Sequence, residues 1–210
     1  MTGDPAAVEI APSFTAHTPE RNDFMHIENI SAEEALEKLK KGNQEYLNSR
    51  TGTGDISPEK RSQTYHNGQQ PYAVIIGCSD SRVIPESIFS AGIGELFVIR
   101  VAGNVIDYQQ LGSIEYAAEH LGCKLVLVLG HDQCGAVGAV LSKAPENPAG
   151  YIRSITDEIR KAIGNETDGL KASCLNVKRS VDVIKQHVGS ELTVMGAIYH
   201  TEDGHVEFDI

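Results

Sequence analysis

Two apolar stretches decide the fold: Tyr72-Ala-Val-Ile-Ile-Gly77 and Lys124-Leu-Val-Leu-Val-Leu-Gly130. Both are short, rich in branched aliphatic residues and closed by glycine, which is typical of buried strands. The first is followed directly by Cys78-Ser-Asp-Ser-Arg82 and the second by His131-Asp-Gln-Cys134. Because sites in open α/β sheets form where the strands end, we expect these two polar segments to meet at one edge of a sheet.

Three side chains in these segments are candidate metal ligands: Cys78, His131 and Cys134. Two thiolates and one imidazole form a set that zinc accepts, with a fourth position left for water or substrate. His131 and Cys134 are at positions i and i+3 at the start of a predicted helix, so both can point at one ion. The alternative is a hydrogen-bonded histidine at a strand end beside two inert thiols. The pattern favours the first interpretation, a zinc enzyme with one ion per chain.

Strand and helix alternate through the centre of the chain. Strands are predicted near residues 72–77, 96–101, 124–130 and 192–199, and residues 205–209 can pair beside the last across the Asp203-Gly204 turn. Helices are predicted near residues 85–91, 109–121, 135–141, 151–163 and 169–188. The alternation predicts an α/β fold with a mostly parallel central sheet, of about four parallel strands plus a C-terminal strand, flanked by helices.

Residues 1–28 are polar and aperiodic, and we expect them to form a flexible or partner-bound arm. A helical segment then begins at Ser31, which can form a capping box with Glu34. Its apolar stripe is interpreted as packing, and Gly42 should weaken the isolated helix by ~1 kcal/mol relative to alanine. Residues 29–210 are expected to form a single zinc-binding domain.

Composition excludes several classes of protein. The 29 acidic and 18 basic residues give a formal net charge of −11, which argues against nucleic acid or an anionic membrane as a partner. No stretch approaches the ~20 apolar residues of a membrane span. No basic segment followed by an apolar one is visible at the N-terminus, so we expect a cytoplasmic protein.

The segments that hold the candidate ligands closely resemble the β-class carbonic anhydrases. The resemblance is carried by Gly77-Cys-Ser-Asp-Ser-Arg-Val83 and Gly130-His-Asp-Gln-Cys-Gly-Ala-Val137. Further similar segments lie at residues 39–43, 95–100, 102–104, 112–116 and 196–199, so the likeness extends from about Ser31 to Ile210. A single HxxC motif is weak evidence, whereas CxDSR with a distant HxxC, each after a strand, is highly specific.

The resemblance implies the reversible hydration of carbon dioxide to bicarbonate and a proton, by attack of zinc-bound hydroxide. Asp80 and Arg82 can approach each other on a loop, and by themselves they are compatible with a surface ion pair worth ~0–1 kcal/mol. In the family the matching residues form the catalytic dyad. In some members that aspartate leaves its arginine and becomes the fourth zinc ligand of a closed state.

Charge and composition suggest which form of the site this chain has. Two thiolates neutralise the ion's positive charge, so a zinc-bound water should be less acidic than the ~7 of a three-histidine site, and activity should favour alkaline pH. The allosteric members of the family bind bicarbonate with a tryptophan, an arginine and a tyrosine. This chain has no tryptophan and has Ile75 at the matching position, so the resemblance favours a non-allosteric enzyme in which Arg100 has a structural role.

The resemblance also implies a pocket for a small apolar substrate. Gln69, Phe97 and Tyr116 match residues that line it in the family, although Tyr116 could equally be a core residue of its helix. Gly135 follows a candidate ligand, which suggests close approach of the backbone to metal or substrate.

In family members the N-terminal helices embrace a partner subunit, so a homodimer, a dimer-based tetramer or a larger oligomer is expected. Two other functions stay open at this point. Some proteins on this scaffold hydrolyse carbon disulfide or carbonyl sulfide, and a bicarbonate sensor or structural zinc protein would bind without turnover. The intact dyad argues against the last of these.

Overall fold

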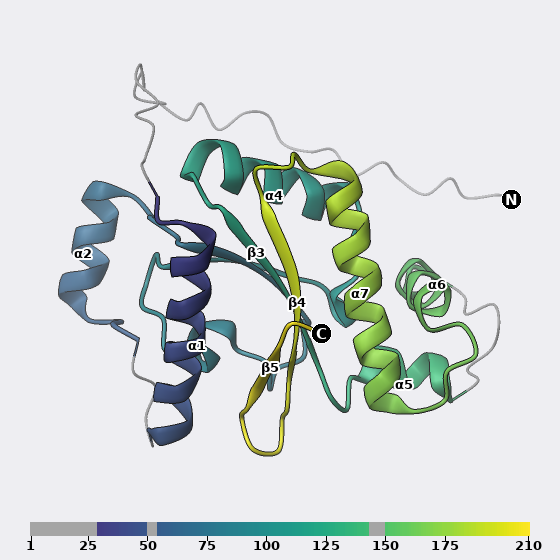
Figure 1. The fold of residues 1–210 in the computed structure, drawn as a ribbon. Helices are drawn as coiled ribbons and strands as arrows, with labels where there is room; N and C mark the ends of the chain where they lie inside the picture. Colours follow the sequence, from purple (N-terminus) through teal and green to yellow (C-terminus); the bar gives the residue numbers. More distant parts are fainter. Residues whose placement is uncertain (1–28, 50–53, 143–149) are drawn as a thin grey trace, which may run out of the picture.

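The structure is a computed structural model that describes residues 29–49, 54–142 and 150–210. The predicted arm, residues 1–28, lies outside the described residues. The described part of the chain contains one five-stranded sheet in the order β2-β1-β3-β4-β5 (Figure 1). Strands β1 to β4 pair in parallel, and β5 runs antiparallel to β4. The strands are β1 (Ala73–Gly77), β2 (Leu96–Arg100), β3 (Leu125–His131), β4 (Thr193–Tyr199) and β5 (Val206–Phe208). The predicted fold class is confirmed.

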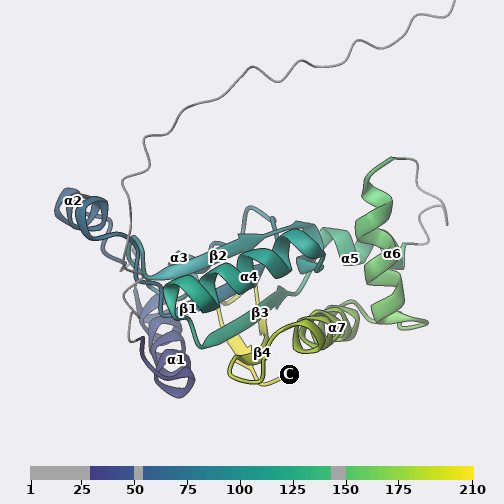
Figure 2. The same cartoon turned by 90° about the horizontal axis from the view of Figure 1, so that it is seen from above.

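Helices cover both faces of the sheet, which makes a three-layer molecule (Figures 1 and 2). Side chains alternate along the paired strands β1 and β3, so that Ile75 and Leu127 belong to one apolar cluster and Val74 and Val126 to the other. The first cluster is closed by α1 and α3, and the second by α4 and α7. These helices are α1 (Ala32–Asn48), α3 (Pro85–Ile88), α4 (Tyr108–Leu121) and α7 (Gly169–His187).

Helix α1 is built as the sequence predicts and is tied to the core of its own chain. Ser31 caps it and forms the reciprocal capping box with Glu34. Gly42 lets the helix pack closely against the backbone of Phe89, since a Cβ there would lie 1.9 Å from the carbonyl oxygen of Phe89. Helix propensity alone does not indicate this role. The buried Asn43 amide donates to the carbonyls of Ile88 and Gly204 and accepts from the N–H of Val206. The helix therefore crosses directly over the loop after α3.

A third apolar cluster surrounds the carboxyl ends of the strands and contains Cys78 and Cys134. It is made by residues on either side of a short 3₁₀ turn after β2, by α7, and by two helices that extend beyond the sheet edge (Figure 2). The turn is η1 (Ala102–Asn104), and the two helices are α5 (Gly135–Leu141) and α6 (Ile152–Ile163). The two cysteines that follow β1 and β3 are thus covered by packed apolar side chains.

Two local features differ from the sequence prediction. Helix α2 (Pro58–Asn67) was not predicted, because none of its residues is buried and it has no apolar stripe; it lies apart from the sheet in both views (Figures 1 and 2). Helix α3 ends at Ile88, before the predicted residue 91, and Ser90 then adopts the left-handed φ of 48°. Within the described ranges, no helix combines the length and apolar character that crossing a membrane requires.

Candidate metal centre

The three candidate ligands come together at the carboxyl edge of the sheet. Cys78 follows β1, His131 is the last residue of β3, and Cys134 is the N-cap of α5. Their ligand atoms all lie within 4.8 Å of one another, and the three side chains are buried. Because β1 and β3 are adjacent parallel strands, their ends deliver the two segments to the same place.

The His131 ring tests whether a metal fits. It is 1% exposed, and neither ring nitrogen has a hydrogen-bond partner among the described residues. A buried polar atom without a partner costs free energy, so such a ring in a native core indicates a missing ligand. A metal ion would use one of these nitrogens together with the two sulfur atoms. Two cysteines and one histidine suit zinc, with a fourth position open.

One of the two sulfur atoms, that of Cys78, is prepared to carry negative charge. The hydrogen bond from the Cys134 thiol lowers the pKa of Cys78, and His131 and the N–H groups of Gly103 and Asp80 lower it further. The pKa of Cys134 is raised because its thiol proton is held in the hydrogen bond to Cys78 and because the side chain is buried, and the repulsion of a second thiolate by the first adds to both. A bound dication removes that repulsion, since metal-coordinated thiols are deprotonated.

Asp80 and Arg82 form a bidentate ion pair beside His131. The Arg82 Nε donates to Oδ1 at 3.0 Å and Nη2 donates to Oδ2 at 2.8 Å. Nη2 also donates to the carbonyl of Gln133 at 3.1 Å, which ties the two polar segments together. The Asp80 Oδ2 lies 4.0 Å from His131 Nε2, so the carboxylate borders the ligand set while Arg82 holds it.

The Arg82 guanidinium holds the pKa of Asp80 well below the ordinary carboxyl value. Asp80 is therefore an ionised, acceptor-only group throughout the neutral range. Its side chain is 18% exposed, against 51% for Arg82, so the acidic oxygens face inward and the guanidinium faces solvent.

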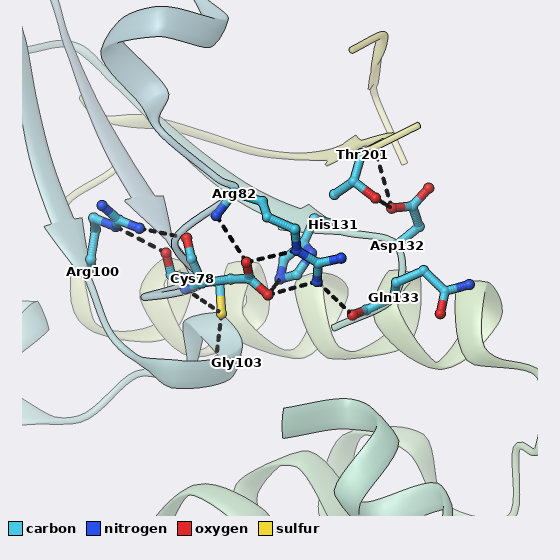
Figure 3. A network of polar contacts seen from close by, with 9 residues as sticks. Cys78, Arg82, Arg100, Gly103, His131, Asp132, Gln133 and Thr201 are labelled. Atoms are coloured by element: carbon cyan, nitrogen blue, oxygen red, sulfur yellow. Dashed lines mark hydrogen bonds and ion pairs between the residues drawn. The ribbon is translucent and has the colours of Figure 1, made fainter. Parts of the chain in front are cut away.

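Two further residues shape the loop, and the sequence indicated their roles only weakly. Arg100, at the end of β2, donates from Nε to the Cys78 carbonyl at 3.0 Å and from Nη2 to the Asp80 carbonyl at 2.7 Å. Arg100 therefore has the expected structural role, because it binds two carbonyls of the loop that carries Cys78 and Asp80. The N–H of Gly103 donates to the Cys78 sulfur at 3.2 Å (Figure 3). The sequence marked this donor only through the segment 102–104, which follows a strand and resembles the β-class carbonic anhydrases.

The predicted substrate residues do not gather around the triad of their own chain. Gln69 precedes β1, at the opposite end of that strand from Cys78. Phe97 and Tyr116 pair with ring centroids 6.0 Å apart, on the face of the sheet that α4 covers. Tyr116 is 46% exposed, so the alternative of a core residue is wrong.

Gly135 is the first residue of α5 and directly follows the ligand Cys134. A Cβ at this position would have no heavy atom within 4 Å among the described residues, so the protein leaves open space beside it. The close approach of its backbone to metal or substrate stays a prediction.

Comparison with known proteins gives one consistent result. A family model described as carbonic anhydrase matches residues 73–206. Carbonic anhydrase 2 of Mycobacterium tuberculosis is 37% identical over 185 residues, which cover 81% of this chain and 89% of that protein. The β-carbonic anhydrase CafA of Aspergillus fumigatus is similar in structure, with 26% identity, a TM-score of 0.63 and coverage of 84% of this chain and 87% of that one. One of two tetrameric β-carbonic anhydrases of Sordaria macrospora has 25% identity and a TM-score of 0.59, covering 71% of this chain and 89% of that one.

Proposed function

The chain belongs to the β-class carbonic anhydrase family, and from this premise we propose that it catalyses the zinc-dependent, reversible hydration of carbon dioxide to bicarbonate and a proton. The observation that carries the proposal is a buried ligand set with an orphaned imidazole beside an ionised, arginine-held carboxylate. A structural zinc site needs the ligands but has no use for the carboxylate.

Cys78, His131 and Cys134 would hold one zinc ion per chain. The chemistry that zinc supplies at a three-ligand site is Lewis acidity, which generates a hydroxide nucleophile from water. Side chains of α5, α6 and α7 pack around the two cysteines and would limit the approach of solvent to the ion.

Asp80 would orient the nucleophile. Its Oδ2 is the carboxylate atom beside His131, and as an ionised oxygen it can only accept a hydrogen bond. A nucleophile that donates its hydrogen to this atom keeps a lone pair free for the carbon of the substrate. Arg82 holds both carboxylate oxygens, and this grip would keep Asp80 from becoming the fourth ligand of a closed site.

The function is tested by stopped-flow measurement of carbon dioxide hydration on the zinc-loaded protein. We expect turnover well above the uncatalysed rate, and loss of that turnover after zinc is removed with a chelator. Carbon disulfide serves as the comparison substrate. Hydrolysis of carbon disulfide with no hydration of carbon dioxide would contradict the proposal, and so would zinc binding without turnover of either.

Hydration activity is expected to rise as the pH increases above neutrality. Two thiolates cancel the charge of the ion, so the nucleophile forms less readily than at a three-histidine site. The pKa of Asp80 is lowered, so this carboxylate is already ionised below neutral pH and cannot account for the rise. A profile of kcat/KM between pH 6 and about 9.5 checks the direction. A maximum in the acidic range would contradict it.

We also propose a homodimer or a larger assembly built from dimers. Gln69, Phe97 and Tyr116 remain the proposed substrate-pocket residues, and since they lie away from the triad of their own chain, they could line a pocket only across an interface. Exposed aromatic side chains are available to form such an interface, since Tyr65 is 84% exposed and Tyr108 is 83% exposed. The stripe of α1 gives no support, because it packs on its own sheet.

Deleting residues 1–28 is expected to loosen this assembly and lower activity together. The segment is aperiodic and too short for a core of its own. An obligate interface should exceed ~2,000 Å². Sedimentation velocity at the concentration of the activity assay measures the effect. A fully active monomer of the unaltered chain would contradict the proposed assembly, and an unchanged oligomer after deletion would remove the arm from it.

A further inference from the structure

The 3₁₀ turn η1 holds an unusual backbone beside the metal centre. Gly103 and Asn104 have consecutive left-handed φ values of 70° and 44°. Such a conformation is free for glycine but unfavourable for asparagine, so the surrounding structure must hold it. This backbone conformation directs the N–H of Gly103 at the Cys78 sulfur, at 3.2 Å.

Helix α7 supplies the contacts that hold η1. The side-chain amide of Asn176 donates to the Gly103 carbonyl at 2.7 Å, and the Ser180 hydroxyl donates to the Asn104 carbonyl at 2.9 Å. Both donors are buried, with 2% and 3% exposure. They are four residues apart on one helix face, so together they fasten two successive carbonyls of the turn.

The opposite side of the turn is closed by packing. A Cβ on Gly103 would lie 2.8 Å from Ile159 Cδ1 and 3.1 Å from the Ala136 Cβ. The turn thus sits between α5 and α6 on one side and the polar face of α7 on the other. Ile159 and Ala136 crowd the turn on one side, and the α7 hydrogen bonds hold its two carbonyls on the other.

We propose that Asn176, assisted by Ser180, is a positioning residue for the metal centre: it holds η1 so that the Gly103 N–H stays on the Cys78 sulfur. The inference rests on the proposed zinc site and adds to it. A hydrogen bond to a ligating thiolate orients the sulfur and stabilises its charge, and the loss of outer partners of this kind typically weakens metal binding by about 10–100-fold.

Three variants of α7 test the proposal. Asn176→Ala removes the donor to Gly103, and Ser180→Ala removes the donor to Asn104 with a smaller change in volume. Ser173→Ala is the matched control, because Ser173 is 3% exposed on the same helix and its hydroxyl has no partner among the described residues. Zinc dissociation constants are measured by chelator competition. The exchange rate of the Gly103 amide is measured by NMR on zinc-loaded protein, and thermal melts of each metal-free variant report folding.

We expect Asn176→Ala to weaken zinc binding by about 10–100-fold and to speed exchange of the Gly103 amide, with a smaller effect of the same kind from Ser180→Ala. Ser173→Ala should match the unaltered protein in both. If Asn176→Ala fails to fold, Ser180→Ala decides the question.

Zinc affinities and Gly103 exchange that are unchanged in folded variants would overturn the inference and leave the proposed function intact. Equal losses in all three variants, the control included, would overturn it as well, because they would indicate a general effect on α7. If the unaltered chain bound no zinc, the proposed function would fail and this inference with it.

Discussion

Replacing Cys134 by Ser is expected to abolish stoichiometric zinc binding and, with it, carbon dioxide hydration. Cys134 contributes one of two sulfur atoms within 4.8 Å of the other ligand atoms, and a hydroxyl is a much poorer donor to zinc than a thiolate. The remaining cysteine and histidine would leave the ion with two protein ligands. Metal analysis of the purified protein should give about one zinc per chain before the substitution and almost none after it.

Cys123→Ser is the matched control for this experiment. Cys123 is 2% exposed, comparable to the 5% of Cys134, and its thiol donates to the Pro71 carbonyl at 3.2 Å, a bond that a serine hydroxyl can make. Burial raises the pKa of Cys123 to about 12, so it is a neutral thiol and no competitor for the metal. Stoichiometric zinc in Cys134→Ser would refute the ligand assignment. Loss of zinc from Cys123→Ser would show that the assay reports general damage to the core.

The strands and the triad could be predicted because both depend on local sequence. A short run such as 124–130 has enough branched aliphatic residues to specify a buried strand without knowledge of its neighbours. The position of the triad then follows from parallel pairing, since the ends of adjacent strands must meet. Cys78 and His131 are 53 residues apart in the sequence, yet the fold class alone brings them together.

The features that the sequence did not predict depend on distant partners. Asn176 lies 73 residues from Gly103, and nothing in the α7 sequence distinguishes a buried amide that binds a carbonyl from one that faces solvent. The role of Gly42 could not be predicted for the same reason. Its lack of a side chain lets α1 approach the backbone of Phe89 closely, and helix propensity contains no information on that contact. Helix α2 lacks apolar periodicity altogether, and only its Ser57 cap and Pro58 mark its start.

The predicted substrate pocket shows a different limit. The family resemblance that suggested Gln69, Phe97 and Tyr116 gives their positions in the sequence, but one chain holds them away from its own Cys78. A resemblance identifies which residues line a site without saying which copy of the chain supplies them. Because one chain keeps these residues away from its own triad, assigning them to the pocket predicts that a second copy of the chain supplies them.

Asp80→Ala is expected to lower kcat/KM for hydration by about 10²-fold or more while leaving zinc in place. Asp80 lies at the edge of the ligand set but is held by Arg82, with hydrogen bonds of 3.0 and 2.8 Å, so we expect it to orient the nucleophile and not to ligate the ion. Asp80→Asn keeps the shape of the side chain and removes its charge. A similar loss in both variants would assign the effect to the ionised acceptor rather than to a cavity.

The matched control is Asp157→Ala on α6. Asp157 accepts hydrogen bonds from Arg153 at 3.1 Å and from Arg160 at 2.9 Å, so it reproduces the arginine-held carboxylate on a surface helix. As an exposed pair it should contribute ~0–1 kcal/mol to stability and nothing to turnover. Activity and zinc content are measured together for each variant. Near-normal turnover in Asp80→Ala would reduce the dyad to the same kind of surface pair.

Arg82→Ala separates the two roles proposed for Asp80. Without the guanidinium, Asp80 Oδ1 keeps the backbone N–H of residue 82 at 3.0 Å, but Oδ2 loses its arginine partner. Because Oδ2 lies 4.0 Å from His131 Nε2, the carboxylate would be freer to take the fourth position. We expect activity to fall as in Asp80→Ala while zinc binding is retained or tightened, because a fourth anionic ligand would join the site. In the double variant, where that carboxylate is absent, the tightening should disappear. If zinc affinity were the same in Arg82→Ala and in the double variant, the closed state would have no basis in this chain, and Arg82 would act only by orienting Asp80.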